Sequence, residues 1–261
     1  MSSGCATALS SFQPAHVPER GHVQAELGVD FSVSTGAIDE VVEGAESAEQ
    51  LADQRRLSNA EKLAILEGAA NLGLNPPAVI PHFGVGYAPF ENWELGVRLA
   101  TSGWRVAVRR QLLKQSEFGL DLSLGFGVGR AVFDPPIETV LDTVHVDDYS
   151  RWNLDVPIAL GQNGSWFRWW LGPRVVYSST SLGVTLTLPN ERVESGSVSG
   201  QALYLGGHAG AAFGYRSVFV GPEITLVQIV GDAEVTALGA TESVDIGSFV
   251  VYPAFAVMGE F

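Results

Sequence analysis

The sequence predicts an all-β fold, a ten-stranded antiparallel up-and-down β-barrel, and three observations support this prediction. First, ten segments alternate apolar and polar residues with a period of two, as strands with one apolar face do. Second, the connections between these segments alternate between long and short, with one exception. Third, the polar faces consist of Gly, Ala and Ser with clustered Arg and carboxylates, a composition suited to a crowded barrel interior.

The composition restricts the class of protein. At 261 residues and 46% hydrophobic content, the chain can close one barrel, so we expect a single domain over residues 22–261 after an N-terminal tail or tether over residues 1–21. We find no run of 18 apolar residues, so a membrane-spanning chain of this kind would have to cross with strands that close on themselves. The net charge of −14 argues against a nucleic-acid partner.

The strands are expected in chain order, each bounded by turn residues. The first five are expected at about 23–34, 78–88, 93–100, 104–111 and 118–129. The next four are expected at about 149–161, 166–178, 200–215 and 217–228, and the tenth runs from about residue 248 to Phe261. Short turns are predicted at 89–92, 102–103, 114–117, 162–165 and 216, and long connections at 35–77, 132–148, 179–199 and 229–246.

The tenth strand places one set of residues on a single face up to the last residue of the chain: Phe249, Val251, Pro253, Phe255, Val257, Gly259 and Phe261. This ending resembles the assembly signal of outer-membrane barrel proteins. Together with the even strand number and the loop asymmetry, it resembles small bacterial outer-membrane β-barrels of the ten-stranded type. The resemblance implies a transmembrane barrel in the bacterial outer membrane with both termini periplasmic. It also implies membrane lipids and the barrel-assembly machinery as partners.

A soluble barrel such as a lipocalin would also alternate, but with apolar residues inside and Lys and Glu dominating the outer face. The polar face found here, together with aromatic residues at strand ends, favours the membrane barrel. The expected periplasmic aromatic girdle is Tyr87, Phe90, Trp93, Phe118, Phe167, Tyr215 and Phe261. The expected outer girdle is Trp104, Tyr149, Trp152 and Tyr177.

Strand parity points a set of charged residues of both signs into the lumen. The predicted network is Glu26, Asp30, Glu94, Arg98, Arg105, Arg109, Asp121, Asp155, Arg168, Arg174 and Glu223. One interpretation is a structural set of ion pairs that fills the barrel, because a desolvated charge needs a partner. The other is a charged constriction that selects small solutes.

Two connections carry signals of their own. Residues 58–61 form a helix-capping box before an apolar stripe of Leu63, Leu66 and Ala70, which predicts a helical insertion at about 36–76. This insertion could act as a plug, lid or partner-binding module, or simply as a cap over the barrel mouth. Alternation from Leu182 to Leu188 predicts a hairpin that extends strands seven and eight beyond the membrane.

Cys5 is the one cysteine, and Ser3-Gly4-Cys5 resembles the end of a bacterial lipobox, which implies a lipid attachment at Cys5. Ser2 departs from the Leu favoured by that motif. The alternative is an incidental cysteine in the tail.

The acidic loop residues Asp142, His145, Asp147 and Asp148 are candidates for a rim-located hydrolase site. We find no nucleophilic-serine, phosphate-loop or zinc motif, so no catalytic residue, metal site or cofactor is predicted. The function expected first is a structural or partner-binding role in the cell envelope, with other envelope proteins contacting the extracellular loops. The alternative is a narrow channel for small solutes or an apolar ligand, and the third hypothesis is the rim hydrolase.

Overall fold

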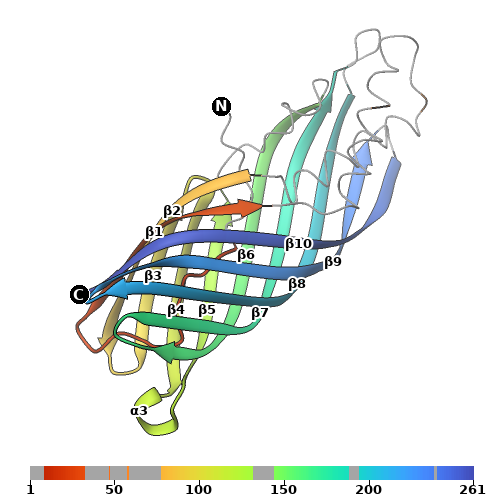
Figure 1. Cartoon of the computed structure of the whole chain (residues 1–261). Coiled ribbons are helices and arrows are strands. Elements are labelled where there is room, and N and C mark those ends of the chain that lie inside the picture. Colours follow the sequence, from red (N-terminus) through yellow and green to blue (C-terminus); the bar gives the residue numbers. More distant parts are fainter. Residues whose placement is uncertain are drawn as a thin grey trace.

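The structure, a computed structural model, describes residues 9–32, 47, 58, 78–131, 144–187, 194–237 and 240–261. The described residues form one closed antiparallel barrel of ten strands, in which each strand pairs with its neighbours in sequence and β10 pairs back to β1 (Figure 1). The predicted ten-stranded barrel is therefore confirmed. The helical insertion expected at about 36–76 lies outside the described residues, apart from two isolated positions. Among the described helices, none is long and apolar enough to span a membrane.

The first five strands are short. They are β1 (Val23–Ser32), β2 (Ala78–Phe90), β3 (Trp93–Ala100), β4 (Gly103–Leu113) and β5 (Asp121–Ala131). The fifth strand was expected to begin at Phe118, and this was wrong, because residues Gln115–Phe118 form the one-turn helix α3. Gly119 ends this helix in the left-handed region with a φ of 77°, a conformation that glycine adopts without steric cost.

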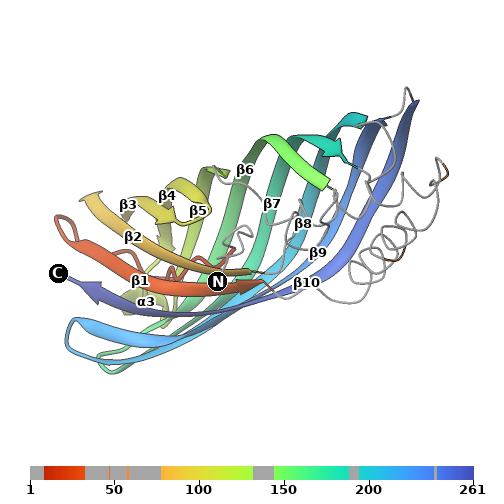
Figure 2. The same ribbon diagram turned by 90° about the horizontal axis from the view of Figure 1, so that it is seen from above.

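The last five strands are about twice as long. They are β6 (Val144–Asn163), β7 (Phe167–Leu186), β8 (Glu194–Tyr215), β9 (Val218–Ala237) and β10 (Ala240–Glu260). One half of the wall therefore extends beyond the other, by roughly 30 Å at about 3.3 Å per residue (Figures 1 and 2). The predicted extension of strands seven and eight is confirmed. The long connection expected at 229–246 was wrong, because β9 and β10 stay paired as far as Ala237 and Ala240.

The two ends of the barrel are distinct. The turn end carries the connections β2–β3, β4–β5, β6–β7 and β8–β9, and there Val23 and Phe261 exchange backbone hydrogen bonds of 2.8 and 2.9 Å. The opposite end, the loop end, carries the connections β1–β2, β5–β6 and β7–β8, and there Ser32 pairs with Ala78. The turn between β3 and β4 also lies at the loop end, because Ala100 and Gly103 are paired there.

The part of the wall nearer the turn end, called the lower wall, has the side-chain pattern of a membrane barrel. Its outward side chains are large, apolar and exposed, and its inward ones are polar and buried. Representative outward residues are Leu27, Phe83, Leu95, Val97, Leu99, Phe126, Leu154, Leu171, Leu205, Ile224, Phe255 and Val257. This apolar band is what a lipid-facing surface requires.

In the extended half of the wall, formed by the loop-end parts of β6–β10, the apolar and polar faces are exchanged. Beyond the band, the inward residues are apolar and buried: Leu182, Val184, Val198, Ala202, Ile229, Ala233, Val235 and Val250. The outward residues at this level are exposed and mainly polar, among them Ser181, Ser197, Ser199, Gln201, Gln228, Asp232, Glu234 and Thr236. A polar outer face over an apolar inner face is the pattern of a sheet in water. This reversal explains the error at 229–246: Val227 and Ile229 face inward, Val230 still faces outward, and the outward face is continuously polar only from Asp232, so the alternation appeared to stop.

Aromatic side chains lie at both edges of the apolar band. Tyr87, Phe90, Trp93, Phe118, Tyr215 and Phe261 are exposed near the turn end, as expected for that girdle. Phe167 joins a cluster with Trp166 and Phe213, at centroid distances of 5.7 and 4.8 Å. Trp104 and Trp152 of the outer girdle pack edge to face at 5.9 Å. These positions fit the interfacial belts of a membrane barrel.

Candidate functional site: the barrel lumen

The N-terminal segment, defined here as residues 9–18, lies inside the barrel. It belongs to no strand, yet Ser10 and Phe12 are fully buried and Leu9, Ala15 and His16 are 2 to 6% exposed. Its contacts run along the lumen from Gln111 near the turn end to the β3–β4 turn near the loop end, where Leu9 lines a cavity with Ser102 and Gly103. The sequence placed these residues in a tail or tether, and the structure places them in the middle of the barrel (Figure 1).

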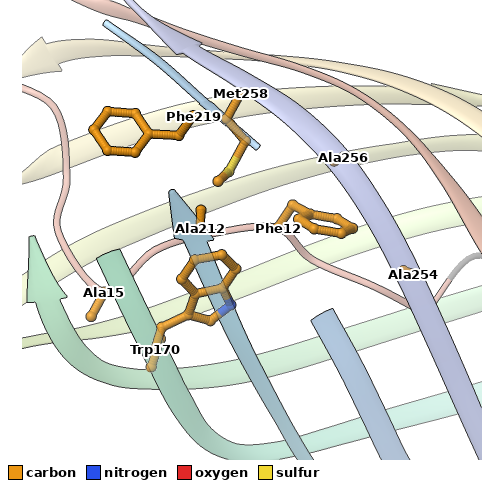
Figure 3. Close-up of a cluster of buried hydrophobic side chains, with 9 residues drawn as sticks. Phe12, Ala15, Trp170, Ala212, Phe219, Ala254, Ala256 and Met258 are labelled. Atoms are coloured by element: carbon orange, nitrogen blue, oxygen red, sulfur yellow. The ribbon is translucent and has the colours of Figure 1, made fainter. Parts of the chain in front are cut away.

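The side chain of Phe12 anchors this segment. Its ring lies 6.5 Å from Trp170, centroid to centroid, and 5.9 Å from the ring of His82. Figure 3 shows the Phe12 ring beside β10, in a buried cluster where small alanine side chains leave space for it. The other members are Ala15, Ala159, Trp170, Ala212, Phe219, Ala254, Ala256 and Met258. Trp170 and Phe219 point inward because they share strand parity with the charged lumen residues.

Glu223 on β9 holds the backbone of the segment. Its carboxylate accepts hydrogen bonds from the N–H of Ser11 at 2.6 Å, the N–H of Phe12 at 3.0 Å and the indole N–H of Trp170 at 2.8 Å. Three donors directed at one buried carboxylate compensate for the loss of its hydration.

Two arginines bind carbonyl groups of the same segment. Arg98 donates to the carbonyl oxygen of Ser10, and Arg109 donates to that of Pro14. Each arginine also pairs with a carboxylate on the wall: Arg98 Nε lies 3.1 Å from Glu26, and Arg109 Nη2 lies 2.5 Å from Glu94. The arginines thus join the wall to the segment.

Asp155 on β6 serves two guanidinium groups. Arg174 donates to both of its oxygens, at 2.9 and 2.7 Å, and Arg105 Nη2 lies 2.5 Å from Oδ2. Asp155 and Arg174 are 4% and 2% exposed. A bidentate guanidinium–carboxylate pair of this kind is strong and fixes the geometry of both partners.

A further pair lies toward the turn end. Arg168 lies 2.9 Å from Glu260, which also lies 2.9 Å from His16 of the N-terminal segment. Asp121 accepts hydrogen bonds from the Gln111 side chain at 2.7 Å and the Gln115 backbone at 2.8 Å.

The structure brings all eleven predicted network residues into the lumen, on strands β1, β3, β4, β5, β6, β7 and β9. Among these eleven residues, Asp30 accepts a hydrogen bond from the Ser10 hydroxyl. Arg151 also faces the lumen: it is 1% exposed and donates to Tyr204 at 2.5 Å and Ser178 at 2.8 Å. Prediction missed the N-terminal segment and Trp170. Strand parity could have found the inward Trp170, but residues 9–18 show no periodic signal.

Cavities lie at both ends of the segment. A cavity of about 950 Å³ opens at the turn end and is lined by residues that include His16, Glu91, Lys114 and Glu260. There, the 2.6 Å hydrogen bond from Lys114 lowers the pKa of Glu91 and raises that of Lys114. A smaller cavity of about 60 Å³ lies toward the loop end, against Leu9, Arg105 and Arg174. The N-terminal segment occupies the space between them.

The rim residues considered for hydrolysis do not form a described site. His145 and Asp148 lie on β6 with exposed side chains, while Asp142 and the Asp147 side chain fall outside the described residues. In the part of the chain that the structure describes, no group of three or more His, Cys, Asp or Glu side chains is placed to hold a metal ion.

No protein-family model matches the sequence, and a search of curated proteins also finds no match. Solved structures with a similar fold include a major outer membrane protein from Thermus thermophilus, at 11% identity and a TM-score of 0.40, covering 92% of this chain and 99% of that one. Neisserial surface protein A is 9% identical with a TM-score of 0.33 and coverages of 92% and 96%. Ail of Yersinia pestis is 10% identical with a TM-score of 0.31 and coverages of 93% and 99%.

Proposed function

We propose that this chain is a closed outer-membrane β-barrel with a structural or partner-binding role in the cell envelope. The observation that carries the proposal is the filled lumen. The N-terminal segment and the ion pairs of Arg98, Arg109 and Asp155 occupy the interior, and these groups are buried. A lumen closed by paired charges supports a scaffold better than it supports free passage of solutes.

The extended half of the wall is the surface proposed to meet partners. Its outer face carries exposed polar residues such as Gln201, Asp232 and Glu234, and it projects beyond the apolar band. The partners we propose are other envelope proteins at this face, membrane lipids around the band, and the barrel-assembly machinery at β10. In this arrangement the turn end, with Phe261, is periplasmic. Leu9 lies toward the opposite end, and the lipid attachment predicted at Cys5 lies outside the described residues.

Conductance of the full-length chain in planar bilayers tests the closed state. We expect no steady current at moderate voltage, because the segment blocks the axis of the barrel. A stable ohmic conductance in every insertion would overturn the proposal. Copurification from envelope extracts tests the partner-binding role: we expect a specific envelope protein to be lost when the exposed residues Asp232 and Glu234 are replaced by lysine. If the same proteins copurify after these changes, this surface is not the docking face.

The second candidate is a narrow channel for small solutes, favoured by the cavities of about 950 and 60 Å³ on either side of the segment. If the segment moves aside, the exposed lining would include Arg98, Arg105 and Arg109. Currents that appear intermittently, and whose anion preference falls in Arg98→Ala, are the result expected of this channel. If neither the wild-type protein nor Arg98→Ala shows such currents, the channel is excluded. We propose no catalytic role.

A further inference from the structure

The N-terminal segment is held mainly through groups that any peptide has. Arg98 and Arg109 bind the carbonyl oxygens of Ser10 and Pro14, while Glu223 binds the N–H groups of Ser11 and Phe12. Gln111 Oε1 accepts the N–H of Val17 at 3.0 Å. Five backbone groups of one short segment are thus satisfied by side chains of four wall residues. This is how a protein recognises a bound peptide, with main-chain hydrogen bonds giving affinity.

Side chains of the segment add selectivity at three points. Phe12 fills the apolar cluster beside Trp170, and the Ser10 hydroxyl lies between Asp30 and Arg98. His16 contacts Glu260 at the turn end. An aromatic anchor between two polar contacts defines a register for the peptide, because a shift by one residue would bring Ser11 or Gln13 to the apolar cluster.

The wall is complete without the segment. β1 pairs with β10 from Gln24 with Glu260 to Asp30 with Ala254, and with β2 from Val23 with Tyr87 to Ser32 with Ala78. Residues 9–18 take part in no strand, so their departure would break no rung of the β-ladder. Phe12 also has a φ of 41°, in the left-handed region that a residue with a side chain adopts only at a steric cost. The bound conformation is therefore one that the wall imposes.

We propose that the lumen is a binding site for a short peptide that lies along it, occupied in the same chain by residues 9–18 and able to exchange that segment for a free peptide of the same chemistry. The ligand class is a short peptide with a serine two residues before an aromatic anchor and a histidine four residues after it. This inference goes beyond the closed scaffold proposed above. It makes the segment a ligand of the barrel rather than a part of its core.

The test uses the full chain, cut after folding. A site-specific protease sequence is inserted between Arg20 and Gly21, which are both exposed at the turn end. The folded protein is cleaved in detergent and washed with increasing urea, and heat-modifiable gel mobility reports whether the barrel remains closed. A fluorescent peptide with the sequence of residues 9–18 is then added, beside a matched peptide carrying Phe12→Ala and a scrambled peptide.

We expect the cleaved fragment to leave at a urea concentration at which the barrel is still folded, and the wild-type peptide to rebind at least about tenfold more tightly than the other two. The same exchange in a Glu223→Gln barrel should weaken binding of the wild-type peptide, since two backbone N–H groups lose a charged acceptor. Three results would overturn the proposal: the barrel unfolds before or together with fragment release, the wild-type peptide fails to rebind, or it binds no better than the scrambled one.

Discussion

Glu223 on β9 accepts a 3.0 Å hydrogen bond from the backbone N–H of Phe12, a residue 211 positions earlier in the chain. This contact joins the middle of the N-terminal segment to β9 of the barrel wall. It satisfies a buried carboxylate and a buried amide together, so neither group can lose the other without a free-energy cost.

Glu223→Gln should therefore loosen the segment while preserving the shape of the side chain. The amide keeps one acceptor but brings an NH₂ group against N–H donors, so we expect a loss of about 1.5–3 kcal/mol in the free energy of unfolding, typical of hydrogen bonds to a charged group. Urea titration in detergent would measure it. Glu234→Gln, an exposed position on the same strand, is the matched control and should stay within about 0.5 kcal/mol of wild type. Equal effects of the two changes would count against the role of Glu223.

Phe12→Ala should empty the anchor pocket. The ring is fully buried between Trp170 and small residues of β8 and β10, so truncation should cost about 3–5 kcal/mol, or release the segment if that costs less. Thermal unfolding followed by gel mobility gives the stability, and hydrogen exchange of the backbone amides at positions 11 and 12, which are bonded to Glu223 in the wild type, reports release of the segment. Phe126→Ala, on the exposed outer face of β5, is the control and should cost much less. A Phe12→Ala protein as stable and as protected as wild type would contradict the anchor.

Strand parity is why so much of the wall could be predicted from sequence. In a strand, residues two apart share a face, so Arg98 and Glu223 follow from the alternation on β3 and β9 alone. Pairing partners could not be predicted, because Asp155 meets Arg105 and Arg174 from strands whose relative register no local pattern states. Register depends on the whole barrel.

The N-terminal segment was missed for a different reason. Its backbone groups, which are the same in every sequence, bind side chains that lie at least 88 residues away in the chain. Leu9 to Pro18 shows neither helical nor strand periodicity, so it was assigned to a tail. The extended half of the wall gave a partial signal, because alternation persists at Leu182. Along β9 the overlap of inward Val227 and Ile229 with outward Val230 hides the alternation, so the strand was predicted to end too early.

Asp155→Asn should be one of the most damaging single changes in the lumen. It leaves Arg105 and Arg174 without their shared carboxylate in a buried site, so we expect a loss of about 3–5 kcal/mol in the free energy of unfolding. Adding Arg174→Gln should recover part of it, because one of the unpaired charges is removed with its desolvation cost. A double-mutant cycle in urea measures this coupling. Additive losses would show that Asp155 and Arg174 act independently.

Leu182 and Ser181 test the reversal of the wall, because they are neighbours on β7 that face opposite ways. Leu182 is 2% exposed on the inner face, whereas Ser181 is exposed on the outer face. Leu182→Asp would bury a carboxylate among apolar side chains, so the extended parts of β7 and β8 should lose protection in amide hydrogen exchange while the lower wall keeps it. Ser181→Asp should leave exchange nearly as in wild type, since its side chain meets water. If this level of the wall were instead surrounded by lipid, the outward Ser181→Asp would be the disruptive change, and that outcome would place the membrane edge farther along β7 than the change of face indicates.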